Sequence, residues 1–544
     1  MIGVVASSDE QAIVEEFFEL FKTPWEFYET GRAYDVVVAT SGEIPLVDAP
    51  LLVVYGSEIK NTDAAQSVGM YARQRGGTLS VGGSPLPIYG DLLTFAKERA
   101  GTTFLETSSG SAGLTIRRGD STIRRLGYDV FREVRLLLSG GQPPEHAHIP
   151  TLDMHIAMLR NWILEAGIPL VEIPPAPADH SCLVCLTHDI DFIGIRNHRF
   201  DHTMWGFLYR SSIGAVRDVL RRRISLVRCL KMWAAAASLP LVYLKLVRDF
   251  WDPFDWYLRV EKRLPATYFI IPVKGRPGDR VNGRHASRRA AAYDISDLAD
   301  RVPVLQKAGC EIAAHGIDAW HSVDKAREER TRLEAVTGAP AAGIRMHWLL
   351  RDADTSSVLD RAGYAYDAGL GYNETIGYRN GTTQVFRPLG ARTLLALPLH
   401  IQDGALFFPQ RLDLSEPDAR RRCDVLLANA RRLGGALTIL WHDRSHGPER
   451  FWGDFYVDLV RALGSIGGWF GTAAQVVRWF EQRRAVRFER AAGGDAVRTA
   501  VRYRGPEIRP PLKIRVHRGS TSVDLPWNGQ SSVELDDVAC SPAA

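Results

Sequence analysis

The strongest constraint on the fold is a series of short apolar segments in the middle of the chain, separated by stretches with helical patterns. The segments with strand character are residues 182–189, 267–273, 310–316, 342–348, 394–400 and 436–443. Repeated strand–helix units of this kind predict a parallel sheet, either a barrel or a doubly wound sheet. In both arrangements functional side chains gather at the carboxyl ends of the strands, and several of these segments end in ionisable residues.

Shorter apolar segments flank this region. Residues 2–7, 35–40 and 51–56 are rich in β-branched residues and predict a parallel α/β layer without a glycine-rich phosphate-binding motif. Alternating segments near the end of the chain predict a small group of strands. The predicted division is a Rossmann-like α/β domain, a connector of a hairpin and helices, a catalytic α/β domain and a β-rich C-terminal appendage, at residues 1–108, 109–179, 180–483 and 484–544.

Composition excludes several classes of protein. The 544-residue chain has 67 Lys and Arg against 63 Asp and Glu, a net charge of +4 that is too balanced for a dedicated nucleic-acid-binding protein. Six cysteines in this length do not form a disulfide framework. The first residues lack the basic and then apolar pattern of a signal peptide, so a cytoplasmic location is expected. The oligomeric state stays open.

One segment, residues 217–244, has two interpretations. A basic stretch that includes Arg221, Arg222 and Arg223 leads into the apolar stretch MWAAAASLPLVYL, which is too short to span a bilayer and contains Pro240. Such a segment can lie on an anionic membrane surface as a peripheral contact. The alternative is a solvated helix that leads into a buried one.

Two carboxylates follow the first strand segment of the central region. In an extended chain residues i and i+2 point to one side, so Asp189 and Asp191 project together while His188 and Ile190 point the other way. Like charges repel at short distance, so a cation or a shared proton is expected there. One carboxylate would bind a divalent metal ion while the other serves as a base. The alternative is a solvated acidic turn.

A later strand segment ends in His315, and His321 follows six residues further on in an expected loop. Two neutral imidazoles with one carboxylate bind zinc-like metals and leave positions open for water and substrate. The sequence therefore predicts one divalent metal ion held by His315, His321 and one of the two carboxylates. The alternatives are a core His315 and a surface His321; if the loop does not deliver His321, His347 or a water would complete the site.

The next strand segment contains Arg345, and Trp348 follows it. A buried guanidinium near Asp189 would hold that carboxylate ionised and oriented. The alternative is an ordinary structural ion pair. Trp348 would bind substrate by walling a pocket for an acyl group or by stacking on a sugar, or it would belong to the core.

The last strand segment ends in His442, which would act as a general acid that protonates a leaving amine. A carboxylate beside the imidazole would raise its pKa and orient it. Asp403 is the first candidate for this partner, and Asp367 is the second.

The ordered set THDID (187–191), HGIDAWH (315–321), IRMHW (344–348) and LWHD (440–443) resembles the polysaccharide deacetylases, the NodB-homology group also called family-four carbohydrate esterases. The resemblance covers roughly residues 180–483. It implies a distorted (β/α) barrel and the hydrolysis of N-acetyl or O-acetyl groups with a divalent metal ion, usually zinc, nickel or cobalt. The region before Thr187 resembles the N-terminal α/β extension of some cytoplasmic members.

For individual positions, the resemblance implies a general base at Asp189, metal ligands at Asp191, His315 and His321, an arginine that holds the base at Arg345, and a general acid at His442. Two features depart from the usual family pattern. Ile190 separates the two acids, as in an Asp-x-Asp form that some branches use. The two histidines are two residues further apart than in the usual HxxxH motif.

The expected function is removal of an acetyl group from an N-acetylated amino sugar, in a polysaccharide or in a lipid-linked or nucleotide-linked precursor. One alternative is a hydrolase of another C–N amide bond on the same scaffold. The other is a non-catalytic carbohydrate-binding protein with a remnant site.

Overall fold

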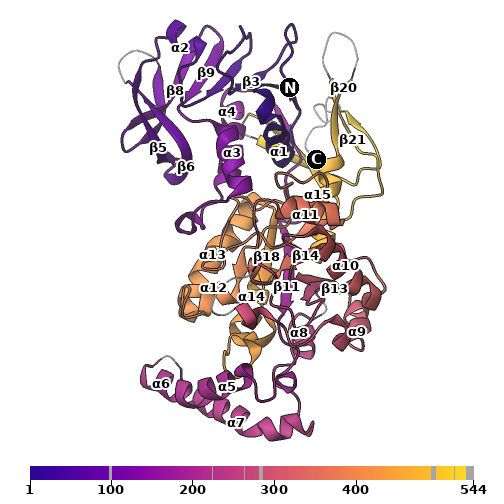
Figure 1. Ribbon diagram of the computed structural model, residues 1–544. Helices are drawn as coiled ribbons and strands as arrows, with labels where there is room; N and C mark the ends of the chain where they lie inside the picture. Colours follow the sequence, from indigo (N-terminus) through magenta and orange to yellow (C-terminus); the bar gives the residue numbers. More distant parts are fainter. Residues whose placement is uncertain are drawn as a thin grey trace.

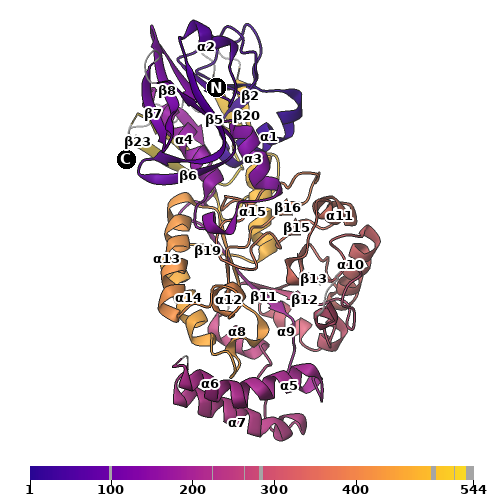
Figure 2. The ribbon, with the colours of Figure 1, turned by 60° about the vertical axis from the view of Figure 1, so that its left-hand side comes forward.

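A computed structural model describes residues 1–96, 101–222, 224–262, 264–280, 286–491, 498–519 and 521–534 of the chain. The described chain forms three parts: an N-terminal sheet with the C-terminal strands beside it, a central α/β part, and a small group of helices at the opposite end (Figures 1 and 2). The sequence also predicts a frayed tail after Val538, and that tail lies outside the described residues.

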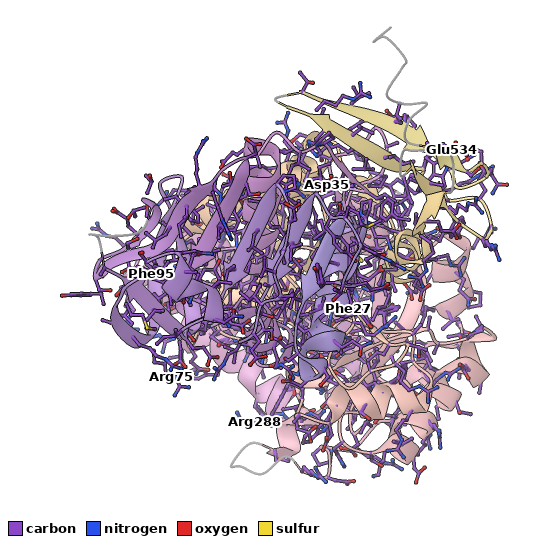
Figure 3. All side chains as sticks on the ribbon, turned by 90° about the horizontal axis from the view of Figure 1, so that it is seen from above. Phe27, Asp35, Arg75, Phe95, Arg288 and Glu534 are labelled. Atoms are coloured by element: carbon purple, nitrogen blue, oxygen red, sulfur yellow. The ribbon has the colours of Figure 1, made fainter. Side chains whose placement is uncertain are left out.

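The N-terminal part is a nine-stranded sheet in the order β2-β1-β3-β4-β9-β8-β6-β5-β7. Its strands are β1 (Ile2–Val5), β2 (Trp25–Phe27), β3 (Val36–Ala39), β4 (Leu51–Tyr55), β5 (Met70–Val81), β6 (Ser84–Phe95), β7 (Thr102–Thr107), β8 (Gly110–Arg118) and β9 (Ser121–Leu126). Strands β1 to β4 are parallel, as the β-branched segments predict, whereas β5 to β8 pair antiparallel. Phe27, in β2 at one edge of the sheet, lies far across it from Phe95, in β6 near the other edge (Figure 3).

The predicted boundary between residues 108 and 109 falls inside this sheet. It separates β7 from β8, which pair with each other, and β8 and β9 form the predicted hairpin. The helices of this part are α1 (Gln11–Phe21), α2 (Asn61–Ala65), α3 (Val130–Ser139) and α4 (Thr151–Glu165). Apolar side chains of α1, α3 and α4 share one core with the sheet.

The central part is a curled parallel sheet in the order β16-β15-β14-β13-β12-β11-β18-β17, with β19 beside β11. Its strands are β11 (Leu183–Ile190), β12 (Ala266–Ile270), β13 (Glu311–Gly316), β14 (Gly343–Met346), β15 (Tyr366–Asp367), β16 (Leu395–Ala396), β17 (Ile401–Gln402), β18 (Ala436–Leu440) and β19 (Trp469–Phe470). The parallel sheet predicted from the apolar segments is therefore confirmed.

The two edge strands of this sheet follow one another in the chain. Only residues 397–400 separate β16 from β17, and the backbone N–H groups of Leu397 and His400 donate to the carbonyls of Asp367 and Thr438. This segment thus bridges β15 and β18, so the sheet curls toward closure as a distorted barrel requires.

Alternation along β11 sorts its side chains to two sides of the sheet. Val184 and Leu186 pack in the core between the sheet and its helices. Leu183 and Cys185 pack in a separate cluster on the other side. Asp189 lies an even number of residues from these two, so its side chain emerges on their side at the carboxyl end of the strand.

The helices around the central sheet are α8 (Phe254–Val260), α9 (Val302–Lys307), α10 (Val323–Thr337), α11 (Thr355–Ala362), α12 (Asp403–Phe407), α13 (Glu416–Leu433), α14 (Gly453–Ser465) and α15 (Ala473–Ala485). Helix α10 shows how the sequence sets their limits. The Ser322 side chain accepts a hydrogen bond from the N–H of Lys325 at its start, and Gly338 ends it with a φ of 65°, which glycine adopts without strain.

A helical insertion, residues 192–252, separates β11 from β12. It contains α5 (His202–Tyr209), α6 (Ala215–Leu220) and α7 (Leu226–Tyr243), with a π-helical turn between α5 and α6. The sequence predicts no apolar segment long enough to span a bilayer, but α7 begins six residues before the apolar stretch. Its 18 residues have a mean hydropathy of 1.2, enough in length and composition to cross a membrane.

The C-terminal strands are β20 (Arg487–Ala491), β21 (Arg498–Arg502), β22 (Leu512–Arg518), β23 (Thr521–Trp527) and β24 (Val533–Glu534). They form two small sheets, one of which takes in β10 (Leu170–Glu172) beside β22. The prolines of residues 171–180 predict a linker in the sequence, but its first two residues belong to this strand. Leu512 and Ile514 of β22 share an apolar cluster with Trp479 of α15, so these strands pack directly on the central part.

Candidate metal centre

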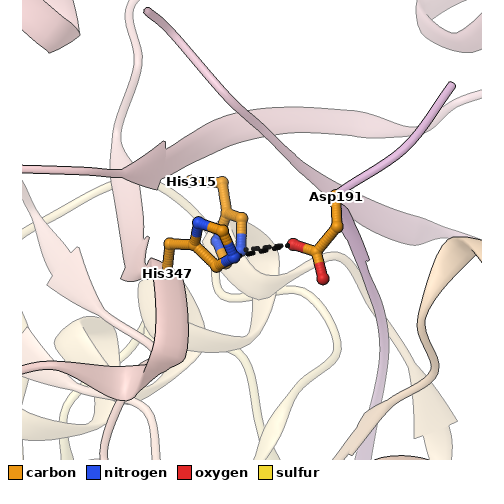
Figure 4. A group of neighbouring side chains, drawn as sticks. All are labelled: Asp191, His315 and His347. Carbon is orange, nitrogen blue, oxygen red and sulfur yellow. Dashed lines mark ion pairs between the residues drawn. The ribbon is translucent and has the colours of Figure 1, made fainter. Parts of the chain in front are cut away.

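Three side chains meet at the carboxyl ends of β11, β13 and β14 (Figure 4). The Nε2 atoms of His315 and His347 lie 3.3 and 3.4 Å from Oδ1 of Asp191. His315 belongs to β13, whereas Asp191 and His347 directly follow β11 and β14. One ligand atom from each side chain lies within 4.8 Å of the other two, which is the spacing of a group that can hold a metal ion.

The hydrogen bonds of these side chains leave their inner atoms available for a cation. Nδ1 of His315 lies 3.0 Å from the Arg345 carbonyl, and a hydrogen bond donated there directs Nε2 toward Asp191. Oδ1 of Asp191 is buried and accepts no hydrogen bond from the described residues. A buried carboxylate oxygen without a partner is costly, and a divalent metal ion would satisfy it. The residues present therefore fit such an ion.

The electrostatics favour the ligand forms of these groups. Burial lowers the pKa of His347 to about 3, so its imidazole is neutral. Burial would raise the pKa of Asp191, but His347, His315 and His442 lower it well below its ordinary range. A neutral imidazole and an ionised carboxylate are the forms that bind metal.

His347, and not His321, is the histidine that joins Asp191 and His315. Nε2 of His321 lies 3.7 Å from Oδ1 of Asp318, in a separate group with Asp279. The Lys325 ammonium group lies 3.0 Å from Asp279 and 3.6 Å from Asp318, so this group already contains a cation. The third ligand position that the sequence assigns to His321 is therefore taken by His347, which the sequence gives as the alternative.

Asp189 lies beside the candidate metal centre, and Arg345 fixes it. Nη1 of Arg345 donates to Oδ1 of Asp189 and to Oγ1 of Thr187, both at 2.8 Å, and Nε donates to the Ala368 carbonyl at 2.9 Å. The other carboxylate oxygen, Oδ2, lies 3.9 Å from Nε2 of His315. One oxygen of Asp189 is therefore anchored while the other faces the centre.

His442 follows β18, and Asp403 holds it. Nδ1 of His442 lies 2.6 Å from Oδ1 of Asp403, and the backbone N–H of His442 donates to Oδ2 at 2.8 Å. The Ser445 hydroxyl also donates to Oδ2. Asp367, the second candidate for this role, instead accepts a hydrogen bond from the N–H of Gly369 at 2.7 Å.

This pairing keeps His442 protonated at neutral pH. Burial alone would lower the pKa of His442, but the Asp403 carboxylate and its hydrogen bond, together with Asp191 and Asp189, raise it to about 9. Burial would raise the pKa of Asp403, and His442 lowers it, so the carboxylate stays ionised. Since Nδ1 is held by Asp403, Nε2 is the ring nitrogen left to exchange a proton.

The candidate metal centre opens into a cavity of about 340 Å³, which Asp189 and His442 also line. Trp348 lines the same cavity and is 41% exposed. Its φ of 67° lies in the left-handed region, which a residue with a side chain adopts only under strain. The backbone thus holds this indole at the cavity wall at a cost in stability.

Five arginines that sequence reasoning missed also line the cavity: Arg288, Arg289, Arg411, Arg444 and Arg450. The Arg444 guanidinium lies over the rings of Phe192 and Trp251, and its Nε is buried without a hydrogen-bond partner among the described residues. Burial and the charge of Arg450 lower the pKa of Arg444 to about 10. The same two causes lower the pKa of Arg411, although Asp403 opposes them. These charges repel each other, so an anion would be stabilised among them.

Comparisons with known proteins add the following. No family model and no curated protein matches the chain. Among solved structures, the chain is similar to a protein from Mycobacterium smegmatis described as a polysaccharide deacetylase, with 19% identity and a TM-score of 0.33 over 57% of this chain and 95% of that one. It is also similar to an allantoinase, with 14% identity and a TM-score of 0.33 over 56% and 92% of the two chains.

A family 4 acetyl xylan esterase from Clostridium thermocellum, in complex with a cobalt ion, has 14% identity and a TM-score of 0.25 over 54% and 90% of the two chains.

Proposed function

We propose that the chain is a metal-dependent hydrolase that removes an acetyl group from an N-acetylated amino sugar. The observation that carries the proposal is the convergence of Asp191, His315 and His347 on one point, with the anchored Asp189 beside them. His442 completes the set from another strand of the same cavity wall. These groups include a base, an acid and a cation site, which metal-assisted amide hydrolysis uses.

Each group has one task in this reaction. A divalent cation held by Asp191, His315 and His347 would polarise the acyl oxygen and favour ionisation of water. Asp189 takes the proton of the attacking water through Oδ2, because Arg345 occupies Oδ1. His442 donates its Nε2 proton to the departing amine, and Asp403 keeps it protonated until then. The products are acetate and a free amino sugar.

We further propose that the sugar carries an anionic group such as a phosphate. Arg411, Arg444 and Arg450 line the cavity and lack a neutralising carboxylate within ion-pair distance in the described part of the chain. Guanidinium groups bind phosphate oxygens in charge-assisted hydrogen bonds. This favours a lipid-linked or nucleotide-linked precursor over a neutral polysaccharide.

Acetate release by the metal-loaded protein tests the reaction. The substrates are an N-acetylated sugar phosphate, a neutral N-acetylated oligosaccharide and a cyclic amide. We expect acetate from the sugar phosphate, and none from an Asp189→Asn variant that retains its metal. Ring opening of the cyclic amide without acetate from either sugar would instead show the alternative C–N hydrolase. No turnover of any substrate would favour a binding remnant.

Kinetics of arginine variants test the anionic substrate. Each charge-assisted hydrogen bond contributes about 1.5–3 kcal/mol, so Arg411→Gln with Arg450→Gln should raise KM for the sugar phosphate at least about tenfold. KM for the neutral oligosaccharide should not change. Arg461→Gln, which alters an exposed arginine of α14, is the control. An equal rise in KM for both substrates would contradict the assignment.

A further inference from the structure

Helix α7 of the helical insertion is apolar on both of its sides. One side packs inward through Cys229, Met232, Leu239 and Val242. The residues of the other side recur at helical spacing and are between 45% and 67% exposed: Leu226, Leu230, Trp233, Leu241 and Leu244. Only 22% of the helix is buried in the structure. A helix on the surface of a globular protein ordinarily shows a polar outer side, so something apolar is expected to cover this one.

Helices α5 and α6, which precede α7, also carry exposed apolar side chains on their outer sides. Trp205 and Tyr209 of α5, and Val216 and Leu220 of α6, are between 43% and 79% exposed. The inner residues of these helices pack on α7, since Phe207 lies in one cluster with Leu239 and Val242, and Ala215 lies in another with Cys229 and Met232. The insertion therefore has a core of its own, and the nine large apolar side chains named above lie outside it. We call these nine the docking surface.

The charge of the insertion identifies what covers it. Residues 192–252 contain eleven arginines and lysines and four acids, and Asp218 is the only acid between residues 202 and 248. Arg217, Arg221, Arg222 and Lys231 are exposed. Apolar side chains interspersed with cations complement the headgroups and acyl boundary of an anionic bilayer. A second copy of this chain would bring the same positive charge and would be repelled.

The position of the insertion suits a flat partner. It projects from the end of the molecule opposite the N-terminal and C-terminal sheets, and no other element lies beyond it in either view (Figures 1 and 2). A planar surface can therefore approach it without meeting another part of the described chain.

We propose that the docking surface binds an anionic phospholipid bilayer, with α7 lying in the interface. The helix does not cross the bilayer, because its inner side remains packed on α5 and α6 through four buried residues. The outer apolar side chains enter the headgroup and acyl boundary, and the arginines contact lipid phosphates.

Docking also positions the candidate metal centre. Phe192, His198, Asp201 and His202 belong to the insertion and line the same cavity as Asp191. A docked molecule would thus hold its cavity next to the bilayer surface. This step rests on the proposed function: the substrate would be an amino sugar joined through phosphate to a lipid whose chain stays in the membrane.

Flotation of the full-length protein with lipid vesicles tests the docking without any need for activity. The vesicles contain phosphatidylcholine alone or with about 30% phosphatidylglycerol, which gives an anionic surface. We expect flotation with the anionic vesicles, at least tenfold weaker binding to the neutral ones, and release by high salt. The variant that tests the apolar side combines Leu230→Glu, Trp233→Glu and Leu241→Glu. The variant that tests the charge combines Arg217→Glu, Arg221→Glu and Arg222→Glu.

Both variants should lose at least tenfold in vesicle binding while their circular dichroism and melting curves match those of the wild type. The matched control places glutamates at exposed apolar residues elsewhere, Leu46, Val304 and Val425, and should float normally. If the apolar variant fails to fold, Leu230→Gln alone should still weaken binding. Equal binding of all variants, or none by the wild type, would overturn the proposal. A dimer of the wild type that dissociates in the apolar variant, without vesicle binding, would assign the surface to a second copy.

Discussion

Asp403 determines the protonation state of His442. The sequence identifies Asp403 only as one of two acids that follow strand segments, whereas the structure shows two hydrogen bonds from His442 to its carboxylate. Sequence reasoning can state that a general-acid histidine needs such a partner, but the partner comes from a different strand and 39 residues away. The direct pairing of β17 with β18 brings the two together, because Gln402 lies in register with Leu440, and Asp403 and His442 follow these two residues.

The pH dependence of the reaction tests this pair. His442 must be protonated to act as an acid, so kcat/KM should fall as pH rises through its pKa of about 9. Asp403→Asn removes the largest cause that raises this pKa and leaves burial, which lowers it. We therefore expect the alkaline limb of the profile to move to lower pH by about two units. The control variant Asp367→Asn should leave the alkaline limb at the pH of the wild type. An alkaline limb that does not move in Asp403→Asn would contradict the assignment of Asp403 as the partner of His442.

Trp348 tests whether the structure stores strain at the cavity wall. In the middle of a helix or strand, a protein with glycine is less stable to unfolding than the same protein with alanine by about 0.5–1 kcal/mol. At a φ of 67° the order of stability should reverse. The free energy of unfolding of Trp348→Gly should therefore exceed that of Trp348→Ala by about 1 kcal/mol, and Trp348→Gly should unfold at a higher urea concentration. Both variants lose the indole and should raise KM. If Trp348→Ala were the more stable of the two variants, the backbone at this position would not be strained.

At the scale of the elements, strand alternation gave the most reliable predictions. The rule that residues i and i+2 share a side placed Asp189 and Asp191 together, and the structure agrees. The same rule applied to β14 puts His347 on the side of Arg345, and this signal could have selected His347 in advance. The family motif directed attention to His321 instead.

The loop after β13 shows why His321 could not be placed from sequence. The Glu329 carboxylate of α10 accepts hydrogen bonds from the backbone N–H groups of Ile317 and Asp318, at 3.0 and 2.7 Å. These hydrogen bonds fix the start of the loop. Within the loop, Asp318 lies 3.6 Å from the Lys325 ammonium group and 3.7 Å from Nε2 of His321, so His321 lies beside Asp318 and not beside Asp191. A contact between a loop and a later helix has no periodic pattern in the sequence.

Helix α7 shows a limit of reasoning from apolar runs. Arg228 and Lys231 interrupt its apolar pattern, so the sequence suggests that the apolar element begins only after them. Both residues are good helix formers whose long side chains extend away from the helix axis, so the helix continues through them. The membrane contact predicted for residues 217–244 stays a prediction, and the exposed side of α7 is the feature that supports it.

At the scale of the whole molecule, the parts on either side of the central α/β part are joined to it by buried contacts. Asp153 of α4 accepts hydrogen bonds from Thr382 and Thr383. Arg483 of α15 donates to the carbonyls of Leu20 and Ile173. The predicted division of the chain by composition could not show these contacts, because they join residues hundreds of positions apart.

Truncation tests this integration. Residues 1–483 alone would lack β22 and β23, whose Leu512, Ile514 and Trp527 are buried in a cluster with Trp479 of α15. Exposing that cluster should cost several times the roughly 1.5–3 kcal/mol of one buried side chain. We expect the truncated chain to be insoluble or to unfold at much lower urea concentration. Unfolding at the same midpoint as the full chain would show that the C-terminal strands are an independent appendage.

The metal content of single variants tests the central claim most directly. Elemental analysis of the purified protein should find about one divalent ion per chain in the wild type and in His321→Ala, because the structure places His321 in a separate group. Asp191→Ala and His347→Ala should contain much less. Loss of the ion in His321→Ala, or a full complement in His347→Ala, would contradict the assignment of Asp191, His315 and His347 as its ligands.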